Sequence, residues 1–352
     1  MTVAHAWAAH APHEPFAPFQ FQRRELDPTD VRIDILYCGI CHSDVHFARA
    51  EWGDPRYPCV PGHEIVGKIR AVGDAVTRFK VGDLAGVGCL VDSCGHCGSC
   101  GEGLEQYCEN GSTGTYMGTE AQSGLPTYGG YSNFIVVRES FVLHVRHEET
   151  DLPAVAPLLC AGITLWSPLR HWNAGPGKKV GIVGIGGLGH MGVKLAHALG
   201  AHVVAFTTSQ SKVAEAHRLG AAEVIISPDA DALAKHAGSF DLIINTVSAA
   251  QDLQTFALLL KRDGTLVLVG AGTEKHTCPD AFTLLMARRS IAGSAIGGIA
   301  ETQEMLDFCA EHGITADIEM VPVQQVDIAY DRIVASDVKY RFVIDMKTLP
   351  AE

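Results

Sequence analysis

The sequence is short of positive charge, with 27 lysines and arginines against 40 aspartates and glutamates and a formal net charge of −13. A chain with this balance repels a polyanionic backbone, so we expect no nucleic acid among its partners. Charged residues of either sign are also sparse, at 19%, whereas 47% of the 352 residues are hydrophobic. This composition excludes global disorder and indicates a globular protein, whose length predicts roughly two or three domains.

Signals for export and for membrane insertion are also lacking. Residues 1–28 have neither a basic start nor a sustained apolar core, so we expect no secretory signal. The uncharged stretch 152–169 approaches the length of a membrane span, but it contains three prolines and a glycine. We interpret it as a buried connection and expect a cytoplasmic protein with no membrane partner. In that compartment an odd count of eleven cysteines is better explained by metal binding than by disulfides.

Two sequence patterns divide the chain near residue 154. The earlier part is β-rich, with strands expected at 31–35, 65–72 and 134–137 between glycine-containing turns. The later part alternates helical stretches with six strand candidates, at 180–185, 202–206, 223–226, 240–245, 265–269 and 290–296. This alternation predicts an α/β protein with a doubly wound parallel sheet. After it we expect helices at 301–311 and 326–335 and a last strand at 341–346.

Four cysteines share one glycine-rich loop with the spacing C-x2-C-x2-C-x7-C: Cys94, Cys97, Cys100 and Cys108. Tetrahedral zinc takes four thiolates, and short glycine-rich spacers let one loop surround the metal. Because the protein would fill all four positions, this zinc would be structural. Free or oxidised thiols and an iron–sulfur cluster are the alternatives, although the spacing departs from the usual ferredoxin run.

A glycine motif, Gly184-x-Gly186-x-x-Gly189, follows an apolar strand and opens an amphipathic helix. In that context the glycines allow a tight turn and a close backbone approach, and the helix N-terminus receives a dinucleotide pyrophosphate. We therefore assign the loop, including Gly187 and Leu188, to cofactor binding.

The strand after this motif ends without the acid that an NAD enzyme usually offers to the adenosine ribose. Hydroxyls at Thr207, Thr208 and Ser209 stand there with the cation of Lys212, and the first carboxylate is Glu215. These groups suit a 2′-phosphate, so we expect NADP(H). The alternative is that Lys212 is an ordinary solvated lysine in the first turn of a helix.

Three further residues, Cys41, His63 and Cys160, do not indicate a metal site by spacing alone. A single histidine is more often hydrogen-bonded within the fold, and a cysteine in an apolar setting usually packs as a small hydrophobic residue.

Together these segments resemble the zinc-dependent medium-chain alcohol dehydrogenases, and within them the cinnamyl-alcohol-dehydrogenase-like, NADP-dependent aldehyde reductases. The matching segments follow the family's order and are Cys38–His46, Pro61–Gly67, the four-cysteine loop, Gly184–His190 and Tyr340–Val343. The resemblance implies a β-rich, GroES-like, zinc-binding catalytic domain at residues 1–153 and 297–352. It also implies a Rossmann dinucleotide-binding domain at residues 154–296.

The resemblance further implies a catalytic zinc held by Cys41, His63 and Cys160 with its fourth position open, which makes two Zn²⁺ per chain. Glu64 would be the acidic neighbour of this metal. Asp44 would orient a ligand such as His63, although it could equally cap a turn.

The remaining implied roles concern the proton and the cofactor. Ser43 and His46 match the family's proton relay, because a hydroxyl both donates and accepts and a histidine exchanges protons near neutral pH. Arg341 matches a position near the cofactor phosphates.

These observations predict a zinc-dependent oxidoreductase that transfers hydride between NADP(H) and a primary alcohol/aldehyde pair. We expect aliphatic or aromatic aldehyde reduction to be favoured, with small-molecule substrates and a homodimeric assembly. The alternatives are an NAD-linked polyol or secondary-alcohol dehydrogenase of the same superfamily, a non-catalytic zinc-binding interaction protein, and a non-catalytic dinucleotide sensor. Five cysteines have no assigned role: Cys38, Cys59, Cys89, Cys278 and Cys309.

Overall fold

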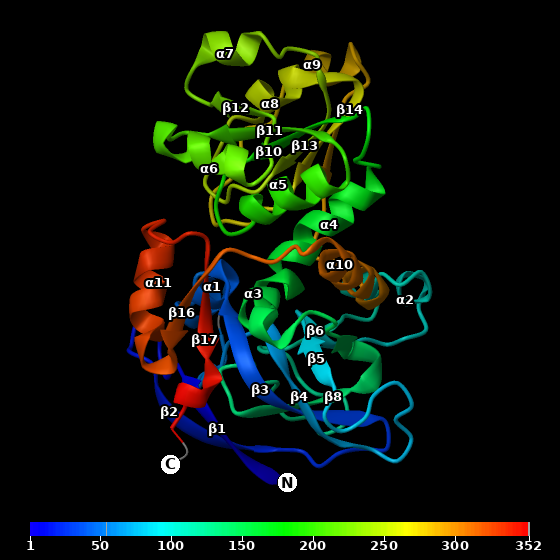
Figure 1. The fold of residues 1–352 in the computed structure, drawn as a ribbon, viewed down its shortest axis with the longest axis vertical. Coiled ribbons are helices and arrows are strands. Elements are labelled where there is room, and N and C mark those ends of the chain that lie inside the picture. Colours follow the sequence, from blue (N-terminus) through cyan, green and yellow to red (C-terminus); the bar gives the residue numbers. More distant parts are fainter. Residues whose placement is uncertain (54, 351–352) are drawn as a thin grey trace. The chain divides into compact units, whose positions relative to one another are not determined.

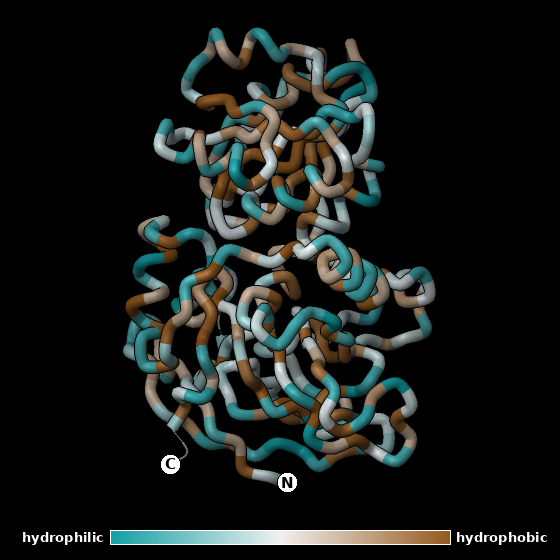
Figure 2. The backbone as a smooth tube through the Cα atoms, viewed as in Figure 1, coloured by the Kyte–Doolittle hydropathy of each residue, from teal (hydrophilic) through white to brown (hydrophobic). Residues whose placement is uncertain are grey.

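The computed structural model describes residues 1–53 and 55–350, and these form two compact units (Figure 1). The first unit comprises Met1–Cys160 and Gly297–Glu352, and the second comprises Ala161–Ile296. Figure 2 shows hydrophobic segments gathered in the interior of each unit, and hydrophilic ones mainly in the outer loops. Each unit therefore has a core of its own, and each is described by itself below.

The second unit is built on a six-stranded parallel sheet in the order β12-β11-β10-β13-β14-β15. Its strands are β10 (Lys179–Val183), β11 (His202–Thr207), β12 (Glu223–Ile226), β13 (Phe240–Asn245), β14 (Leu260–Leu268) and β15 (Ser290–Gly293). Every residue from Val203 to Thr207 is buried, as expected for a strand covered on both faces. The strand order reverses between β10 and β13, so the loop after β10 lies where doubly wound sheets bind ligands.

Helices connect these strands. They are α4 (Ala161–His171), α5 (Gly189–Ala198), η5 (Gln210–Lys212), α6 (Val213–Arg218), α7 (Ala230–Ala234), α8 (Leu253–Leu259) and α9 (Ala281–Leu285). The predicted doubly wound sheet is confirmed, with β12 and β13 at the expected bounds. The strand expected at 265–269 begins earlier, at Leu260, because β14 continues directly from the end of α8 through exposed polar residues that carry no apolar pattern.

The described part of the first unit contains a seven-stranded, mainly antiparallel sheet. Its order is β16-β17-β3-β4-β5-β9, and β8 also pairs with β3. The strands are β3 (Asp30–Ile40), β4 (Ile65–Val72), β5 (Leu84–Val87), β8 (Phe134–Arg138), β9 (Leu143–His144), β16 (Ile318–Pro322) and β17 (Arg341–Asp345). Two small ribbons pair β1 (Thr2–Ala8) with β2 (Ala17–Arg23) and β6 (Leu90–Asp92) with β7 (Thr113–Gly114).

Strand β3 organises this unit because three strands pair with it. It pairs with β4 along most of one edge, whereas β8 and β17 share the other edge. Val31, Ile33 and Ile35 are buried between half-buried polar residues, which is the alternation of a sheet with one apolar face. The end of β3 lies beside the start of β4 and the start of β17, and the pairs Cys38–Ile65 and Ile40–Phe342 fix this register.

Short helices complete the first unit. They are α1 (His42–Ala48), α2 (Gly98–Gly101), η1 (Glu105–Tyr107), η2 (Glu139–Phe141), η3 (Glu149–Asp151), α3 (Leu152–Val155), η4 (Ala156–Leu159), α10 (Ile299–His312), η6 (Val323–Gln325), α11 (Val326–Val334) and η7 (Met346–Thr348). Within residues 1–53 and 55–350, no single helix has the length and apolarity of a membrane span. The segments Glu149–Leu159 and Ala161–His171 meet that test only as a bent pair, and most of their residues are buried inside the protein.

Candidate active site

Four potential metal ligands meet at the ends of β3 and β4. Cys41 directly follows β3, His63 and Glu64 directly precede β4, and Cys160 follows η4. One ligand atom from each of these residues lies within 4.8 Å of the other three, and all four residues are buried. The fold thus brings together the three predicted ligands of the catalytic zinc and the acidic neighbour predicted for it.

The geometry of this cluster fits zinc. The sulfur atoms of Cys41 and Cys160 are 3.8 Å apart, and a tetrahedron with zinc–sulfur bonds of ~2.3 Å places its sulfurs about 3.8 Å apart. The hydrogen bond from Cys160 is the main cause that lowers the pKa of Cys41 well below its usual value, and the charges of Arg341 and His63 act in the same direction. These interactions favour the thiolate of Cys41, the form that binds metal.

The carboxylate of Asp44 contacts the two segments that carry Cys41 and His63. Its side chain is fully buried, and one oxygen accepts a 2.8 Å hydrogen bond from the amide of Cys41 at the start of α1. The other oxygen accepts a 3.1 Å bond from the amide of Gly62 and lies 3.2 Å from Nδ1 of His63. Asp44 thus contacts both the start of α1 and the ring of His63, and its role as a ligand-orienting residue stays a prediction. Because Nδ1 faces Asp44, Nε2 of His63 is the nitrogen left for a metal.

Glu64 forms a fully buried ion pair with Arg341, the first residue of β17. Burial raises the pKa of the Glu64 carboxyl, and the charge of Arg341 opposes that rise. The pair fits because position 39 is glycine: a Cβ there would lie 1.9 Å from Oε2 of Glu64. Arg341 therefore supplies the countercharge at the candidate metal centre, and its predicted contact with cofactor phosphates stays a prediction.

The two relay candidates lie on α1. The hydroxyl of Ser43 is 3.6 Å from the sulfur of Cys41. The ring of His46 stacks between the rings of His42 and Trp52, with centroids 4.7 and 4.6 Å away. Among the described residues, Nε2 of His46 is buried without a hydrogen-bond partner.

Glu51 is a functional candidate that the sequence reasoning missed. Its carboxylate contacts Nδ1 of His46, and the backbone amide of Glu51 donates a 2.8 Å bond to the carbonyl of His46. A carboxylate at this nitrogen fixes the tautomer of the ring. The only sequence signal is an acid five residues after a histidine. This spacing predicts no contact by itself, because Glu51 reaches His46 only through the turn at the end of α1.

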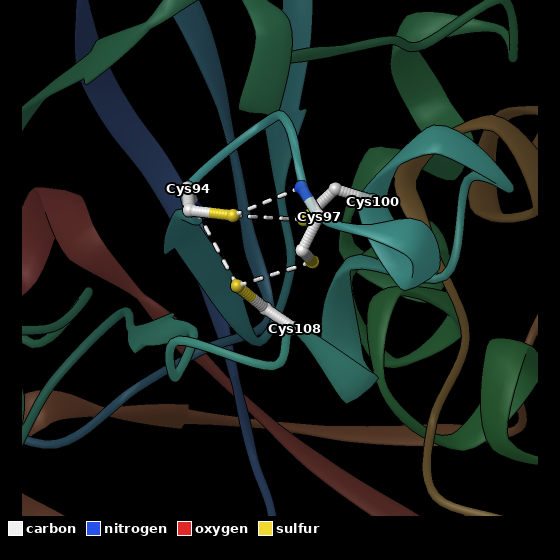
Figure 3. Close-up of side chains that lie close together, drawn as sticks. All are labelled: Cys94, Cys97, Cys100 and Cys108. Carbon is white, nitrogen blue, oxygen red and sulfur yellow. Dashed lines mark hydrogen bonds between the residues drawn. The ribbon is translucent and has the colours of Figure 1, made fainter.

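The four-cysteine loop closes on itself. Figure 3 shows the side chains of Cys94, Cys97 and Cys108 turned toward one another, and the sulfurs of all four cysteines lie within 4.8 Å of each other. The pairs Cys94–Cys100 and Cys97–Cys108 are 3.9 and 4.0 Å apart, near the edge of a zinc–thiolate tetrahedron. A hydrogen bond from the backbone near His96 is the main cause that lowers the pKa of Cys94 to about 5. This loop fits a metal whose four positions are all filled by protein.

Cys89 belongs to the surroundings of the first cluster, although its sequence position gave no role. Its sulfur is 3.8 Å from the carbonyl of Leu159, and a hydrogen bond with Cys160 lowers the pKa of its thiol. The other unassigned cysteines are not members of either cluster: Cys38, which lies beside Glu64, Cys59 and Cys309 are buried, and Cys278 is exposed.

The glycine loop has the geometry that its motif requires. Gly184 has a φ of +88°, and a Cβ on Gly189 would lie 1.7 Å from the carbonyl oxygen of Gly184. Helix α5 begins at Gly189, with Leu188 as its N-cap and Gly187 just before it. The hydroxyl of Thr246, at the end of β13, donates to the carbonyl of Val183 at 2.8 Å, a support that the motif does not contain.

The residues after β11 form a small polar group near this loop. The ammonium of Lys212 donates a 3.0 Å hydrogen bond to the carbonyl of Ile185 inside the glycine loop. Thr207 accepts from the amide of Ser209 at 3.2 Å, whereas Thr208 is exposed. Lys212 is therefore tied to the glycine loop and is not a freely solvated lysine, and its remaining donors are available to an anion.

Sequence comparison defines the class. Residues 27–147 match the alcohol dehydrogenase GroES-like domain, and residues 187–311 match the zinc-binding dehydrogenase domain. The chain belongs to the zinc-binding alcohol dehydrogenase family, which confirms the resemblance of its motifs.

Individual relatives are similar over nearly their whole length. Aldehyde reductase YahK of Escherichia coli is 60% identical, over 98% of this chain and 98% of its own. NADP-dependent alcohol dehydrogenase C of Mycobacterium bovis is 53% identical, over 99% of this chain and 100% of its own. Among solved structures, the crystal structure of CAD from Helicobacter pylori complexed with NADP(H) matches this fold with a TM-score of 0.91. The two sequences are 41% identical, and the match covers 98% of this chain and 99% of that chain.

Proposed function

We propose that this protein is a zinc-dependent oxidoreductase that transfers hydride between NADP(H) and a primary alcohol/aldehyde pair, with reduction of aliphatic or aromatic aldehydes favoured. The observation that carries the proposal is the buried cluster of Cys41, His63 and Cys160, whose donor atoms suit a zinc with one open position. Relatives named aldehyde reductase and NADP-dependent alcohol dehydrogenase support the reaction and the cofactor.

Bound zinc supplies a Lewis acid that polarises the carbonyl, and bound NADPH supplies the hydride. The chain's own residues do the rest. Asp44 fixes the ring of His63, and Arg341 balances the charge of Glu64. The hydroxyl of Ser43 is 3.6 Å from the sulfur of Cys41, the proposed metal ligand. At this position a hydroxyl can donate a proton to the substrate oxygen. His46, whose Nδ1 contacts Glu51, is the group that returns a proton to Ser43.

In this proposal one unit carries the catalytic residues and the other binds the dinucleotide. Residues 1–153 with 297–352 form the catalytic domain, and the four-cysteine loop within it holds a structural zinc. Residues 154–296 form the dinucleotide-binding domain, in which Gly184, Gly186 and Gly189 receive the pyrophosphate. Thiols that must stay reduced to bind zinc are typical of the cytoplasm, where we place the protein.

The preference for NADP(H) rests on Lys212 and on the absence of an acid between Thr207 and Glu215. The closest alternative, an NAD-linked polyol dehydrogenase, needs a carboxylate that pairs with the two ribose hydroxyls at this point. Hydroxyl groups and an ammonium are the complement of a phosphate instead.

A homodimer is the proposed assembly. Strand β15 is the edge of its sheet and carries neither charge nor proline, so its free edge is open to pairing with a second strand. The neighbouring segment exposes Phe282, Leu285 and Met286 by 75%, 71% and 80%. Light scattering after chromatography would give twice the chain mass, and Met286→Glu is expected to shift the protein toward the monomer.

Metal analysis combined with an aldehyde-reduction assay tests the main proposal. We expect two zinc ions per chain and faster turnover with NADPH than with NADH. Cys41→Ser should remove one zinc and abolish turnover without unfolding the protein. A single zinc in the wild type, or a clear preference for NADH, would contradict the proposal.

A further inference from the structure

Tyr116 lies against the imidazole of His63. Their ring centroids are 5.6 Å apart and the ring planes differ by 27°, which is a stacked arrangement. Tyr116 also makes an edge-to-face contact with Phe47 of α1, at 5.4 Å and 83°. Tyr116 is 8% exposed, so its ring is enclosed between the candidate metal ligand and the helix that carries Ser43 and His46.

The backbone next to Tyr116 is held firmly. Thr115 donates its hydroxyl to the carbonyl of Gly88 at 2.5 Å and its amide to the carbonyl of Cys89 at 3.1 Å. These bonds tie the segment after β7 to the chain before β6, so the Tyr116 ring has a fixed base.

Contacts of two kinds position His63. The 3.2 Å contact of Nδ1 with Asp44 and a hydrogen bond with Cys41 act at the edge of the ring. The stacked ring of Tyr116 acts on the face of the imidazole and opposes tilting out of its plane. Metal–nitrogen bonds depend on the ring's orientation, and partners that fix ligand orientation affect metal affinity strongly.

We propose that Tyr116 is a positioning residue of the catalytic metal centre, acting through His63 by stacking on its ring. This inference rests on the proposed function, because it needs zinc at Cys41, His63 and Cys160. The stacked face is the part of Tyr116 that contacts His63 directly. The Tyr116 oxygen is buried and lies near the carboxylate of Asp44, although in the described structure it makes no hydrogen bond of ordinary geometry. Phenylalanine at this position keeps the stacked face and removes only the hydroxyl, so it separates the two contributions.

The test compares zinc release from the wild type, Tyr116→Phe and Tyr116→Leu in the presence of a chromogenic chelator. Leucine removes the stack, and we expect the catalytic zinc to leave about 10- to 100-fold faster, the range for loss of an orienting partner. Tyr116→Phe should release zinc at the wild-type rate. Cobalt in the same site should give an altered visible spectrum in the leucine variant only. Cys41→Ser identifies which of the two release phases belongs to this site.

Tyr330→Leu is the control, because Tyr330 is also buried, at 2% exposed against 8%, but packs edge-to-face on Phe16, 5.3 Å away, and donates its hydroxyl to Tyr131 at 3.4 Å. It should lower thermal stability and leave zinc release unchanged. If Tyr116→Leu does not fold, Tyr116→Met replaces it in the same comparison.

Three results would overturn the inference: wild-type zinc release from Tyr116→Leu, equal acceleration in Tyr116→Phe, or equal acceleration in Tyr330→Leu. A wild-type protein with no zinc at the Cys41 site would instead refute the proposed function, and this inference with it.

Discussion

Replacing Lys212 by alanine tests cofactor selection at one side chain. Lys212 ends η5, and its ammonium donates to the carbonyl of Ile185 in the glycine loop at 3.0 Å. An ammonium has three donors, so two remain for a ligand phosphate. The group is partly buried and tied in place, which limits the entropy that it loses when an anion binds.

The size of the effect follows from the kind of bond removed. A hydrogen bond between charged partners contributes about 1.5–3 kcal/mol. A difference of 1.4 kcal/mol corresponds to a factor of about ten, so Lys212→Ala should lower kcat/KM with NADPH by roughly 10- to 150-fold. NADH lacks the 2′-phosphate, so its kcat/KM should change by no more than about threefold, from the small loosening of the Ile185 contact.

The assay is initial-rate kinetics with both cofactors at a fixed aldehyde concentration. Lys235→Ala, at an exposed lysine after α7, is the control and should leave both values unchanged. Equal losses with NADPH and NADH would mean that Lys212 only supports the loop. No loss with either cofactor would show that the 2′-phosphate is bound elsewhere.

Cys97→Ser removes one thiolate of the four-cysteine loop; we expect zinc content to fall from two to one per chain and the free energy of unfolding to drop by roughly 3–5 kcal/mol. Unchanged thermal denaturation would rule out a structural zinc there. Glu51→Gln takes the carboxylate from His46, and kcat should fall about tenfold or more with a larger solvent isotope effect, because proton transfer slows; an unchanged isotope effect would remove Glu51 from the relay. Burial lowers the pKa of His236 below 6.5, so the unfolded chain binds this proton more readily, and stability is lost as pH falls through 6.5. His236→Gln should flatten the decline in melting temperature between about pH 7 and pH 5, and an unaltered slope would contradict this assignment.

Local sequence patterns were enough to predict the alternating strands and helices of the second unit and its glycine loop. Its strands are short apolar runs between helical stretches, and the glycine motif falls where a strand meets a helix. The three ligands Cys41, His63 and Cys160 came from the resemblance of whole segments, because their spacing alone means little. The fold explains why they meet: two lie at neighbouring ends of β3 and β4, and the third follows η4.

Residues that act across long sequence distances were not predictable in this way. Tyr116 lies 53 positions from His63, and Cys89 lies 71 positions from Cys160, and neither carries a periodic signal. Thr246 supports a glycine loop some 60 residues earlier through the pairing of β10 with β13. The motif predicts Arg341 near the cofactor but does not indicate its ion pair with Glu64. Such contacts depend on strand order, which no single motif encodes.

The discontinuous first unit has a consequence for the growing polypeptide on the ribosome. All three ligands of the candidate catalytic zinc have been synthesised once residue 160 is made, but β17, which pairs with Tyr37–Ile40 of β3, comes only after the entire second unit. Until then Glu64 has no Arg341 beside it, and the backbone of Tyr37–Ile40 lacks its neighbour strand. For about half of its synthesis the growing chain therefore contains all three ligands and Glu64 without Arg341, and its last residues both complete the sheet and supply the countercharge.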